Sequence, residues 1–153
     1  MLAKPYILIA EDDPDDQEMI KKAILRYSPD VDFVWVKDGP DLLAFLDEAR
    51  ENELPALIIL DYKLPIMTAA DVLDIMNQNS RHISITKMVW STSNRPEYVD
   101  KCIQRGAGHY FLKPTSVEQL QNIVQYIIDS IDFHQSIWAS PVSQESRPRQ
   151  HDF

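Results

Sequence analysis

The sequence contains a single cysteine, only three glycines and fewer basic than acidic residues. One cysteine excludes a disulfide framework and any CxxC pair, and it favours a reducing compartment. The 24 acidic and 15 basic side chains give a formal net charge of −9, which argues against a nucleic-acid-binding protein and against docking on anionic lipid, because both need a basic surface. The N-terminal apolar run is too short for a signal peptide or a membrane span. We therefore expect a cytoplasmic protein without a nucleic-acid or membrane partner.

The chain does have a regular alternation of two apolar patterns. Short runs rich in β-branched and aromatic residues predict strands at 6–10, 32–36, 56–60, 87–91 and 109–112. Helical periods follow each run; they place Tyr27, Ile103 and Val117 on inward faces, and the last one can continue to about Ala139. Five strands alternating with five helices predict an α/β fold with a doubly wound parallel sheet. The length of 153 residues suits one domain, which we place at 1–133, followed by a helix extension and polar tail at 134–153.

Polar side chains stand at the ends of the predicted strands: Glu11 and Asp12, Asp61, Ser91 and Thr92, and Lys113. Ligands of doubly wound sheets bind at the carboxyl ends of the strands, so we expect these side chains to meet at one edge. Carboxylates gathered in a small site repel one another, at a cost of about 4 kcal/mol for two unit charges ~4 Å apart near the protein surface. A hard divalent cation would offset that repulsion, and Mg²⁺ (or Mn²⁺) prefers oxygen ligands.

The segments "ILIAEDD", "LIILDYKLP", "VWST" and "YFLKP" follow one another in this order. Ser91 and Lys113 stand 30 and 52 residues after Asp61. This order and spacing resemble the receiver domain of bacterial two-component response regulators, in particular the single-domain, chemotaxis-regulator-like kind. The resemblance covers about residues 4–132 and implies a flavodoxin-like (βα)5 fold with strand order 2-1-3-4-5.

The resemblance implies a role for each carboxylate of the site. Asp61 is identified as the phosphoacceptor, the nucleophile that becomes an aspartyl phosphate. The metal ligands would be Asp61, Asp12 directly, Glu11 through water and the main-chain carbonyl of Lys63. The cofactor implied is Mg²⁺ or Mn²⁺.

Five further positions match the part of the family motif that senses the phosphoryl group. The Ser91 hydroxyl and the Lys113 ammonium would bind phosphoryl oxygens, with Lys113 acting as a compact point charge. Thr92 stands in the family's small-residue position. Tyr110 matches the family's switch aromatic, although plain core packing is an equally open interpretation. Pro114 would follow a cis peptide bond, as in the family.

The function implied is that of a single-domain response regulator in a two-component system or phosphorelay. A histidine kinase or histidine phosphotransfer protein would donate the phosphoryl group to Asp61 in a Mg²⁺-dependent step. The transfer would switch the surface made by the fourth helix, fifth strand and fifth helix, which would bind a downstream protein and is also a possible homodimer interface. Such a protein catalyses its own phosphorylation and dephosphorylation but turns over no external substrate.

Other interpretations of the same residues stay open. Acidic residues after a strand can simply stabilise the N-terminus of the next helix, and we assign Asp13, Asp15 and Asp16 to that role. A degenerate receiver could bind a protein constitutively, without phosphorylation. A flavin protein would need a Ser/Thr/Gly-rich phosphate loop where "EDDPDD" stands, and a dehalogenase-type phosphatase would need an aspartate at Lys63. Thr68-Ala69 replaces the family's common Asp-Gly, so Thr68 is the expected cap of the third helix.

Overall fold

The computed structural model describes the backbone of residues 5–139 and the side chains of residues 5–131. The strands are β1 (Tyr6–Ala10), β2 (Asp32–Val36), β3 (Leu57–Asp61), β4 (Thr86–Ser91) and β5 (His109–Leu112). The helices are α1 (Pro14–Tyr27), α2 (Gly39–Glu48), α3 (Ala69–Met76), α4 (Pro96–Gln104) and α5 (Val117–Ala139), with a short 3-10 turn η1 (Glu51–Glu53) after α2. Among these residues, no helix has both the length and the apolar character needed to cross a membrane.

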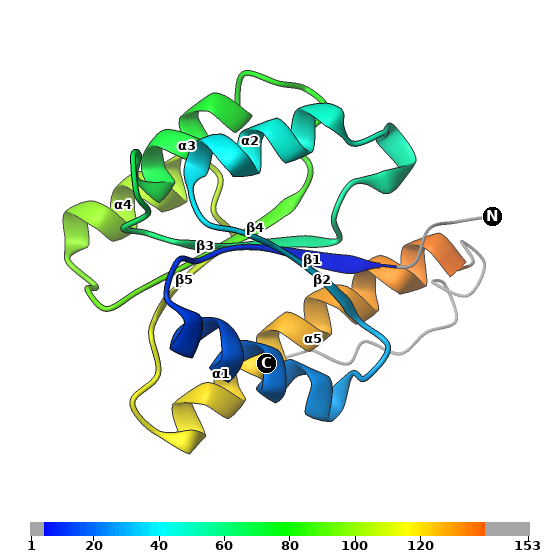
Figure 1. The fold of residues 1–153 in the computed structure, drawn as a ribbon, viewed down its shortest axis with the longest axis vertical. Coiled ribbons are helices and arrows are strands. Elements are labelled where there is room, and N and C mark those ends of the chain that lie inside the picture. Colours follow the sequence, from blue (N-terminus) through cyan, green and yellow to red (C-terminus); the bar gives the residue numbers. More distant parts are fainter. Residues whose placement is uncertain (1–4, 140–153) are drawn as a thin grey trace.

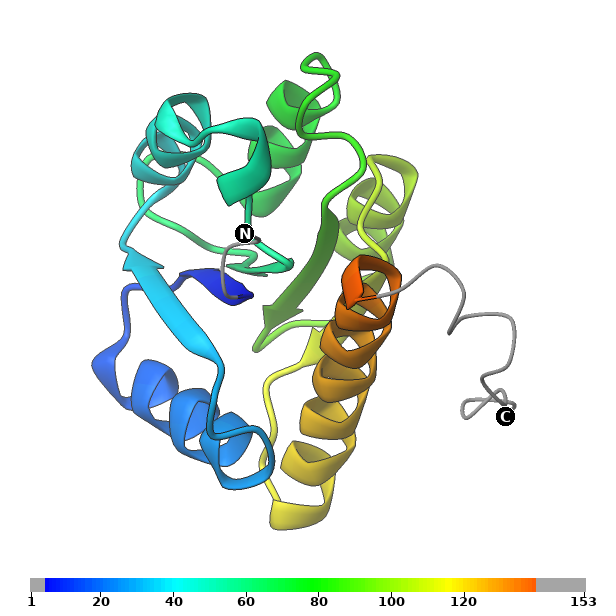
Figure 2. The same cartoon turned by 90° about the vertical axis from the view of Figure 1, so that its right-hand side faces the viewer.

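All strand pairs are parallel, and the sheet has the order β2-β1-β3-β4-β5. Helices α1 and α5 lie side by side on one face of the sheet, and α2, α3 and α4 cover the other (Figures 1 and 2). The predicted doubly wound fold and its strand order are therefore confirmed. Helix α5 passes through the predicted boundary at residue 133 and reaches Ala139, whereas the predicted polar tail from residue 140 onward lies outside the described residues.

The two faces of the sheet carry separate apolar clusters, because successive side chains of a strand point to opposite faces. Leu8, Ile58 and Val89 pack beneath α2, α3 and α4, while Ile59 and Trp90 pack against α1 and α5. Every residue of β3 is buried, as expected for a central parallel strand covered on both faces. The predicted strand 56–60 is observed one residue later, so Asp61 is the last residue of β3 and is held by the sheet.

Side-chain caps fix the first turns of α1 and α3, which begin near the carboxyl ends of the strands. Asp13 caps α1 by accepting a hydrogen bond from the Asp15 amide at 2.8 Å. Thr68 and Asp71 form a reciprocal capping box at the start of α3, so the predicted capping role of Thr68 is confirmed. The turn before it contains Ile66 at φ 77°, in the left-handed region that a β-branched residue rarely adopts.

Three apolar residues that the helical periods place inward are exposed. Tyr27, Ile103 and Val117 have exposed fractions of 55%, 47% and 70%, so these predictions were wrong. Each lies within the first or last two residues of its helix, where neighbouring elements cover fewer sides than along the middle. Periodicity identifies the buried face of a helix but does not indicate where along the helix that burial ends.

Candidate functional site

Three carboxylates meet at the carboxyl ends of the two central strands. Glu11 and Asp12 follow β1, and Asp61 ends β3, which pairs with β1. One oxygen from each of the three lies within 4.8 Å of the others. Glu11 is fully buried and Asp61 is 7% exposed, while Asp12 is exposed. The strand ends thus bring together the acidic residues that the sequence predicted to converge.

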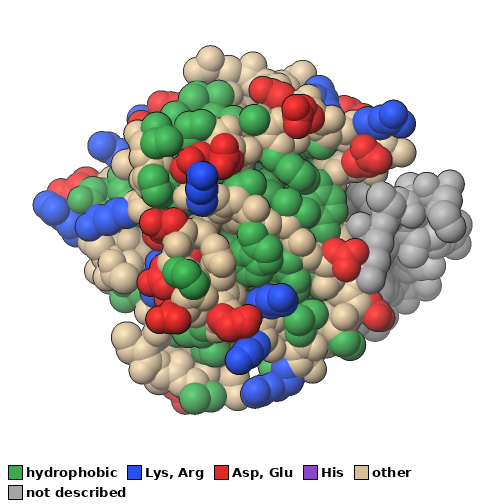
Figure 3. Space-filling view, in the orientation of Figure 1, with side chains coloured by type: hydrophobic (Ala, Val, Ile, Leu, Met, Phe, Trp, Pro, Cys, Tyr) green, Lys and Arg blue, Asp and Glu red, His purple; other side chains and the backbone are tan. Residues whose placement is uncertain are grey.

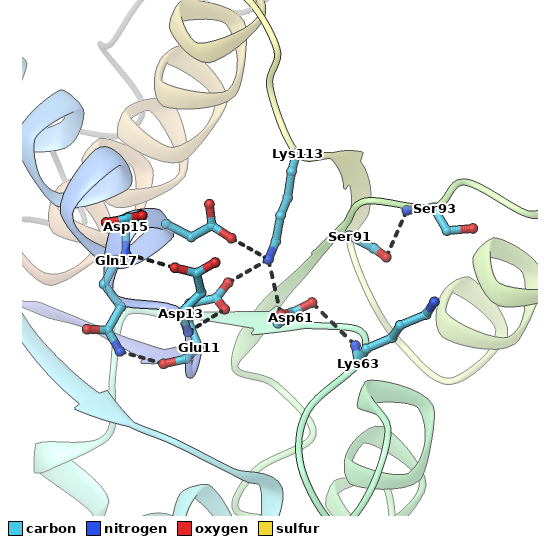
Figure 4. Close-up of polar contacts among 10 residues, drawn as sticks. Glu11, Asp13, Asp15, Gln17, Asp61, Lys63, Ser91, Ser93 and Lys113 are labelled. Atoms are coloured by element: carbon cyan, nitrogen blue, oxygen red, sulfur yellow. Dashed lines mark hydrogen bonds and ion pairs between the residues drawn. The ribbon is translucent and has the colours of Figure 1, made fainter.

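Main-chain groups orient these carboxylates. The Lys63 amide donates a hydrogen bond to Asp61 Oδ1 at 3.3 Å, and the Asp13 amide donates one to Glu11 Oε2 at 3.1 Å. The Gln17 side-chain amide donates to the main-chain oxygen of Glu11 at 2.5 Å. Figure 4 shows these contacts, with the Lys63 side chain directed away from Asp61. The carboxylates of Glu11 and Asp61 are therefore held by the connections that follow their strands.

The ammonium of Lys113 lies at the centre of the cluster (Figure 4). Its Nζ donates hydrogen bonds to Asp16 Oδ2 at 2.7 Å and to Asp61 Oδ2 at 3.1 Å, and it forms an ion pair with Glu11 Oε1 at 3.0 Å. It also lies 5.1 Å from the centre of the Trp90 ring. Burial opposes the charge, but the contacts with Asp16 and Glu11 and the charge of Asp61 raise the pKa of Lys113 above its ordinary value. Lys113 is therefore a cation at physiological pH.

Asp16 belongs to the cluster, although the sequence interpretation assigned it only to helix N-terminal charge. It lies in the first turn of α1, and its side chain is 23% exposed. The contact with Lys113 joins residues 97 positions apart, so no local pattern indicates it. Asp13 is the α1 cap, as assigned, and Asp15 is exposed.

The cluster carries more negative charge than its one ammonium offsets. Burial, and then the charge of Asp61, raises the pKa of Glu11 from 4.5 to about 7, against the opposing effect of Lys113. Glu11 Oε1 is buried and faces the Lys113 ammonium at 3.0 Å, but among the described residues it accepts no hydrogen bond of good geometry. A buried oxygen without a hydrogen bond, beside two other carboxylates, fits a divalent cation that prefers oxygen ligands.

Ser91 and Tyr110 lie together beside Asp61. Ser91 is buried at the end of β4, and its Oγ accepts a hydrogen bond from the Ser93 amide at 3.1 Å. The Tyr110 phenol donates to the Ser93 main-chain oxygen at 2.6 Å. Burial raises the pKa of Tyr110, opposed by a hydrogen bond with Ser91. Both predicted switch residues thus contact the same β4–α4 segment.

One predicted site feature differs in the structure, and another, Thr92, makes no contact within the described part of the chain that tests its predicted place at the phosphate site. Thr92 is exposed, and none of the contacts among the described residues joins it to the cluster. The described chain contains no cis peptide bond, so the prediction of a cis bond between Lys113 and Pro114 was wrong. The trans form is the more stable one for most X–Pro bonds, by about 0.5–1 kcal/mol, and with it Lys113 contacts Glu11, Asp16 and Asp61.

Residues 7–125 match the response regulator receiver domain. The chain therefore belongs to this family, whose members are signalling modules of two-component systems and not enzymes that turn over an external substrate. Two-component response regulator ORR13 of Oryza sativa subsp. japonica is 29% identical over 126 residues, covering 82% of this chain and all of that one. Response regulator Rcp1 of Synechocystis is 27% identical over 140 residues, covering 90% of each chain.

Solved structures of cyanobacterial response regulators have the same fold. The phosphorylated cyanobacterial phytochrome response regulator RcpA matches with a TM-score of 0.73 at 27% identity, covering 82% of this chain and 91% of that chain. The Mn²⁺-bound form of response regulator Rcp1 matches with a TM-score of 0.69 at 29% identity, covering 80% and 91%. The flavodoxin-like receiver fold that the resemblance implied is thereby confirmed.

Proposed function

We propose that this protein is a response regulator whose receiver domain accepts a phosphoryl group on Asp61 from a phosphohistidine of a histidine kinase or a histidine phosphotransfer protein. One observation carries the proposal: Lys113 Nζ lies 3.1 Å from Asp61 Oδ2, at the point where Glu11 and Asp12 also converge. A fixed cation beside a carboxylate nucleophile is what phosphoryl transfer requires, because its catalysis depends mostly on positioning and charge neutralisation.

The residues of the site have different roles in the transfer of the phosphoryl group. An Asp61 oxygen attacks phosphorus and forms the new O–P bond, while the P–N bond breaks and the histidine nitrogen leaves with the electron pair. The Lys63 amide and the Lys113 ammonium hold the two Asp61 oxygens in place. Lys113 then pairs with a phosphoryl oxygen. A divalent cation, Mg²⁺ or Mn²⁺, held by Glu11, Asp12, Asp61 and the Lys63 carbonyl would offset the charge of the phosphoryl oxygens.

The phosphoryl group would be read by Ser91 and Tyr110. Once the Ser91 hydroxyl donates to a phosphoryl oxygen, its contact with Tyr110 changes, and with it the packing of β5 against the β4–α4 segment. We place the output on the surface formed by α4, β5 and α5, where Ile103 and Leu112 are 47% and 45% exposed. A downstream protein or a second copy of the chain would bind there.

The distribution of charge supports a protein partner rather than a nucleic acid. On the face shown in Figure 3, acidic and basic side chains of the described residues are interspersed, and the blue groups form no continuous basic area. A phosphate backbone requires such an area. With the net charge of −9, this favours a role in protein–protein signalling.

Mass spectrometry after treatment with acetyl phosphate and Mg²⁺ tests the proposal. The wild type should gain one phosphoryl mass, and Asp61→Asn should gain none. The gain should disappear when EDTA replaces Mg²⁺. If the wild type gains no mass, and beryllofluoride also fails to bind, the alternative of a degenerate, constitutive binding module would be correct instead.

A further inference from the structure

Asp16 holds the shortest contact that Lys113 makes. The distance from Nζ is 2.7 Å to Asp16 Oδ2, against 3.0 Å to Glu11 and 3.1 Å to Asp61. An ammonium has three N–H donors: two of them donate to Asp16 and Asp61, and Glu11 Oε1 takes up the remaining side of Nζ as an ion pair. Beyond the donor that Asp61 gives up, the phosphoryl oxygens can come closer to the ammonium only where Glu11 or Asp16 releases it.

The three carboxylates differ in how easily they can release Lys113. Glu11 is fully buried, so losing its partner would leave a charge without water or counter-charge, which is costly. Asp61 carries the phosphoryl group, so its donor passes to that group, but the phosphoryl oxygens must still share the charge of the ammonium with Glu11 and Asp16. Asp16 is 23% exposed and water can replace the ammonium there, because partly exposed ion pairs contribute little free energy.

We propose that Asp16 competes with the phosphoryl group for the Lys113 ammonium and thereby lowers the stability of the phosphorylated state. Asp16 acts through Lys113 and is a positioning residue, distinct from the cation ligands: the oxygens that lie within 4.8 Å of one another belong to Glu11, Asp12 and Asp61. The negative charge of Asp16 disfavours the phosphorylated state relative to the unphosphorylated one in two ways. It stabilises Lys113 in the unphosphorylated state, and it repels the phosphoryl oxygens once they arrive.

The chain provides a matched control for charge alone. Asp15 precedes Asp16 in the same turn of α1 and is exposed, and the hydrogen bond at that position comes from its main-chain amide, not its carboxylate. Asp15→Asn therefore removes the same unit of charge close to the site without removing a contact to Lys113. Asp16→Glu keeps the charge on a longer side chain and serves as the rescue variant.

Beryllofluoride, a phosphoryl mimic, tests this inference, which rests on the proposed function. Its dissociation constant is measured at saturating Mg²⁺ from the emission of Trp90, which lies beside Lys113, in a Trp35→Phe, Trp138→Phe background. Asp16→Asn should bind roughly fivefold more tightly than wild type, the change in affinity that corresponds to loss of a partly exposed ion pair. Asp15→Asn and Asp16→Glu should bind within about twofold of wild type.

The outcomes separate this inference from the proposed function. Binding to wild type but equal or weaker binding to Asp16→Asn would overturn the competition and leave the proposed function standing. If Asp15→Asn gained as much affinity for beryllofluoride as Asp16→Asn, the loss of one negative charge near the site would explain both gains. That result would also overturn the competition by Asp16. No binding to wild type would overturn both. A direct Mg²⁺ titration of each variant shows that the metal is saturating, and the circular dichroism melting curve shows that each variant is folded.

Discussion

Tyr62, the residue that follows the acceptor Asp61, stacks on Tyr98 of α4 with ring centroids 4.4 Å apart and ring planes 21° apart. Tyr62 is buried and Tyr98 is half-buried, and the Tyr110 ring lies 6.4 Å from Tyr62. The acceptor segment therefore touches the proposed output surface directly, in addition to the contact between Ser91 and Tyr110.

This stack predicts that Tyr98→Leu destabilises the protein although Tyr98 lies far along the chain from the site. An aromatic pair contributes about 0.5–1.5 kcal/mol beyond the area it buries, so we expect the free energy of unfolding to fall by about 1 kcal/mol in urea titrations. Tyr27→Leu is the matched control, because Tyr27 is 55% exposed, and it should change stability by less than about 0.5 kcal/mol. Equal effects of the two substitutions would contradict the role of the stack.

The raised pKa of Glu11 predicts how stability depends on pH in the metal-free protein. The pKa is about 7 in the folded state against 4.5 ordinarily, so the folded protein binds more protons than the unfolded chain between these values. Stability is then highest below pH 4.5 for this group and is lost as the pH rises through 7. We expect the free energy of unfolding in EDTA to fall by about 1–3 kcal/mol from pH 5 to pH 7.5 relative to Glu11→Gln.

The difference in the free energy of unfolding between wild type and Glu11→Gln separates the titration of Glu11 from that of the other carboxylates. Saturating Mg²⁺ should remove most of the difference, because a bound cation favours the charged carboxylate. A stability difference that stays constant across this pH range would show that Glu11 titrates normally in the fold.

Removing Lys113 should have opposite effects on stability and on cation binding. In metal-free protein, Lys113→Met leaves Glu11 and Asp61 without their counter-charge, and we expect a loss of about 2–4 kcal/mol. The affinity for Mg²⁺ should rise about tenfold, because the ammonium no longer competes for the carboxylates. Chemical denaturation in EDTA and calorimetric titration with Mg²⁺ measure the two quantities.

Lys63→Met is the control for that experiment. It removes the same charge from an exposed side chain next to Asp61, while the main-chain hydrogen bond from residue 63 to Asp61 is kept. Both effects should be small in this variant. If Lys63→Met reproduced the gain in Mg²⁺ affinity, long-range charge and not the contact of Lys113 would explain it.

The capping box at the start of α3 predicts a fourth effect on stability. Thr68→Ala removes the side-chain oxygen that accepts from the Asp71 amide at 3.3 Å, and loss of such a cap costs about 1 kcal/mol. Thr68→Ser keeps the hydroxyl and should be close to wild type in a thermal melt. Both variants should still be phosphorylated on Asp61, because no contact of the acceptor depends on Thr68. If Thr68→Ala left the stability unchanged, water would replace the cap without a loss of free energy.

Much of the fold follows from the chain's local patterns. Uninterrupted apolar runs such as "LIIL" are typical of strands buried on both faces, and alternation with helical periods requires parallel strands. Because parallel strands end at the same edge, the polar residues that follow them had to meet there. Glu11, Asp12, Asp61 and Lys113 could therefore be assigned to one site before any coordinate was known.

Other features depend on side chains that approach one another from distant parts of the chain. Asp16 has the composition and place of an ordinary helix-start residue, and only its contact with Lys113, 97 residues later, gives it a part in the site. The sequence patterns likewise did not predict the stack of Tyr62 on Tyr98 or the trans peptide bond before Pro114.

The sequence by itself determined the sheet, its order of elements and the edge at which charge gathers, because periodicity and strand direction are local properties of the backbone. Only the tertiary structure decided which carboxylates share Lys113, which helix ends are left uncovered and which tyrosines stack. Those outcomes depend on helix-to-sheet packing and on the competition of several partners for one donor, and neither is encoded in any single segment.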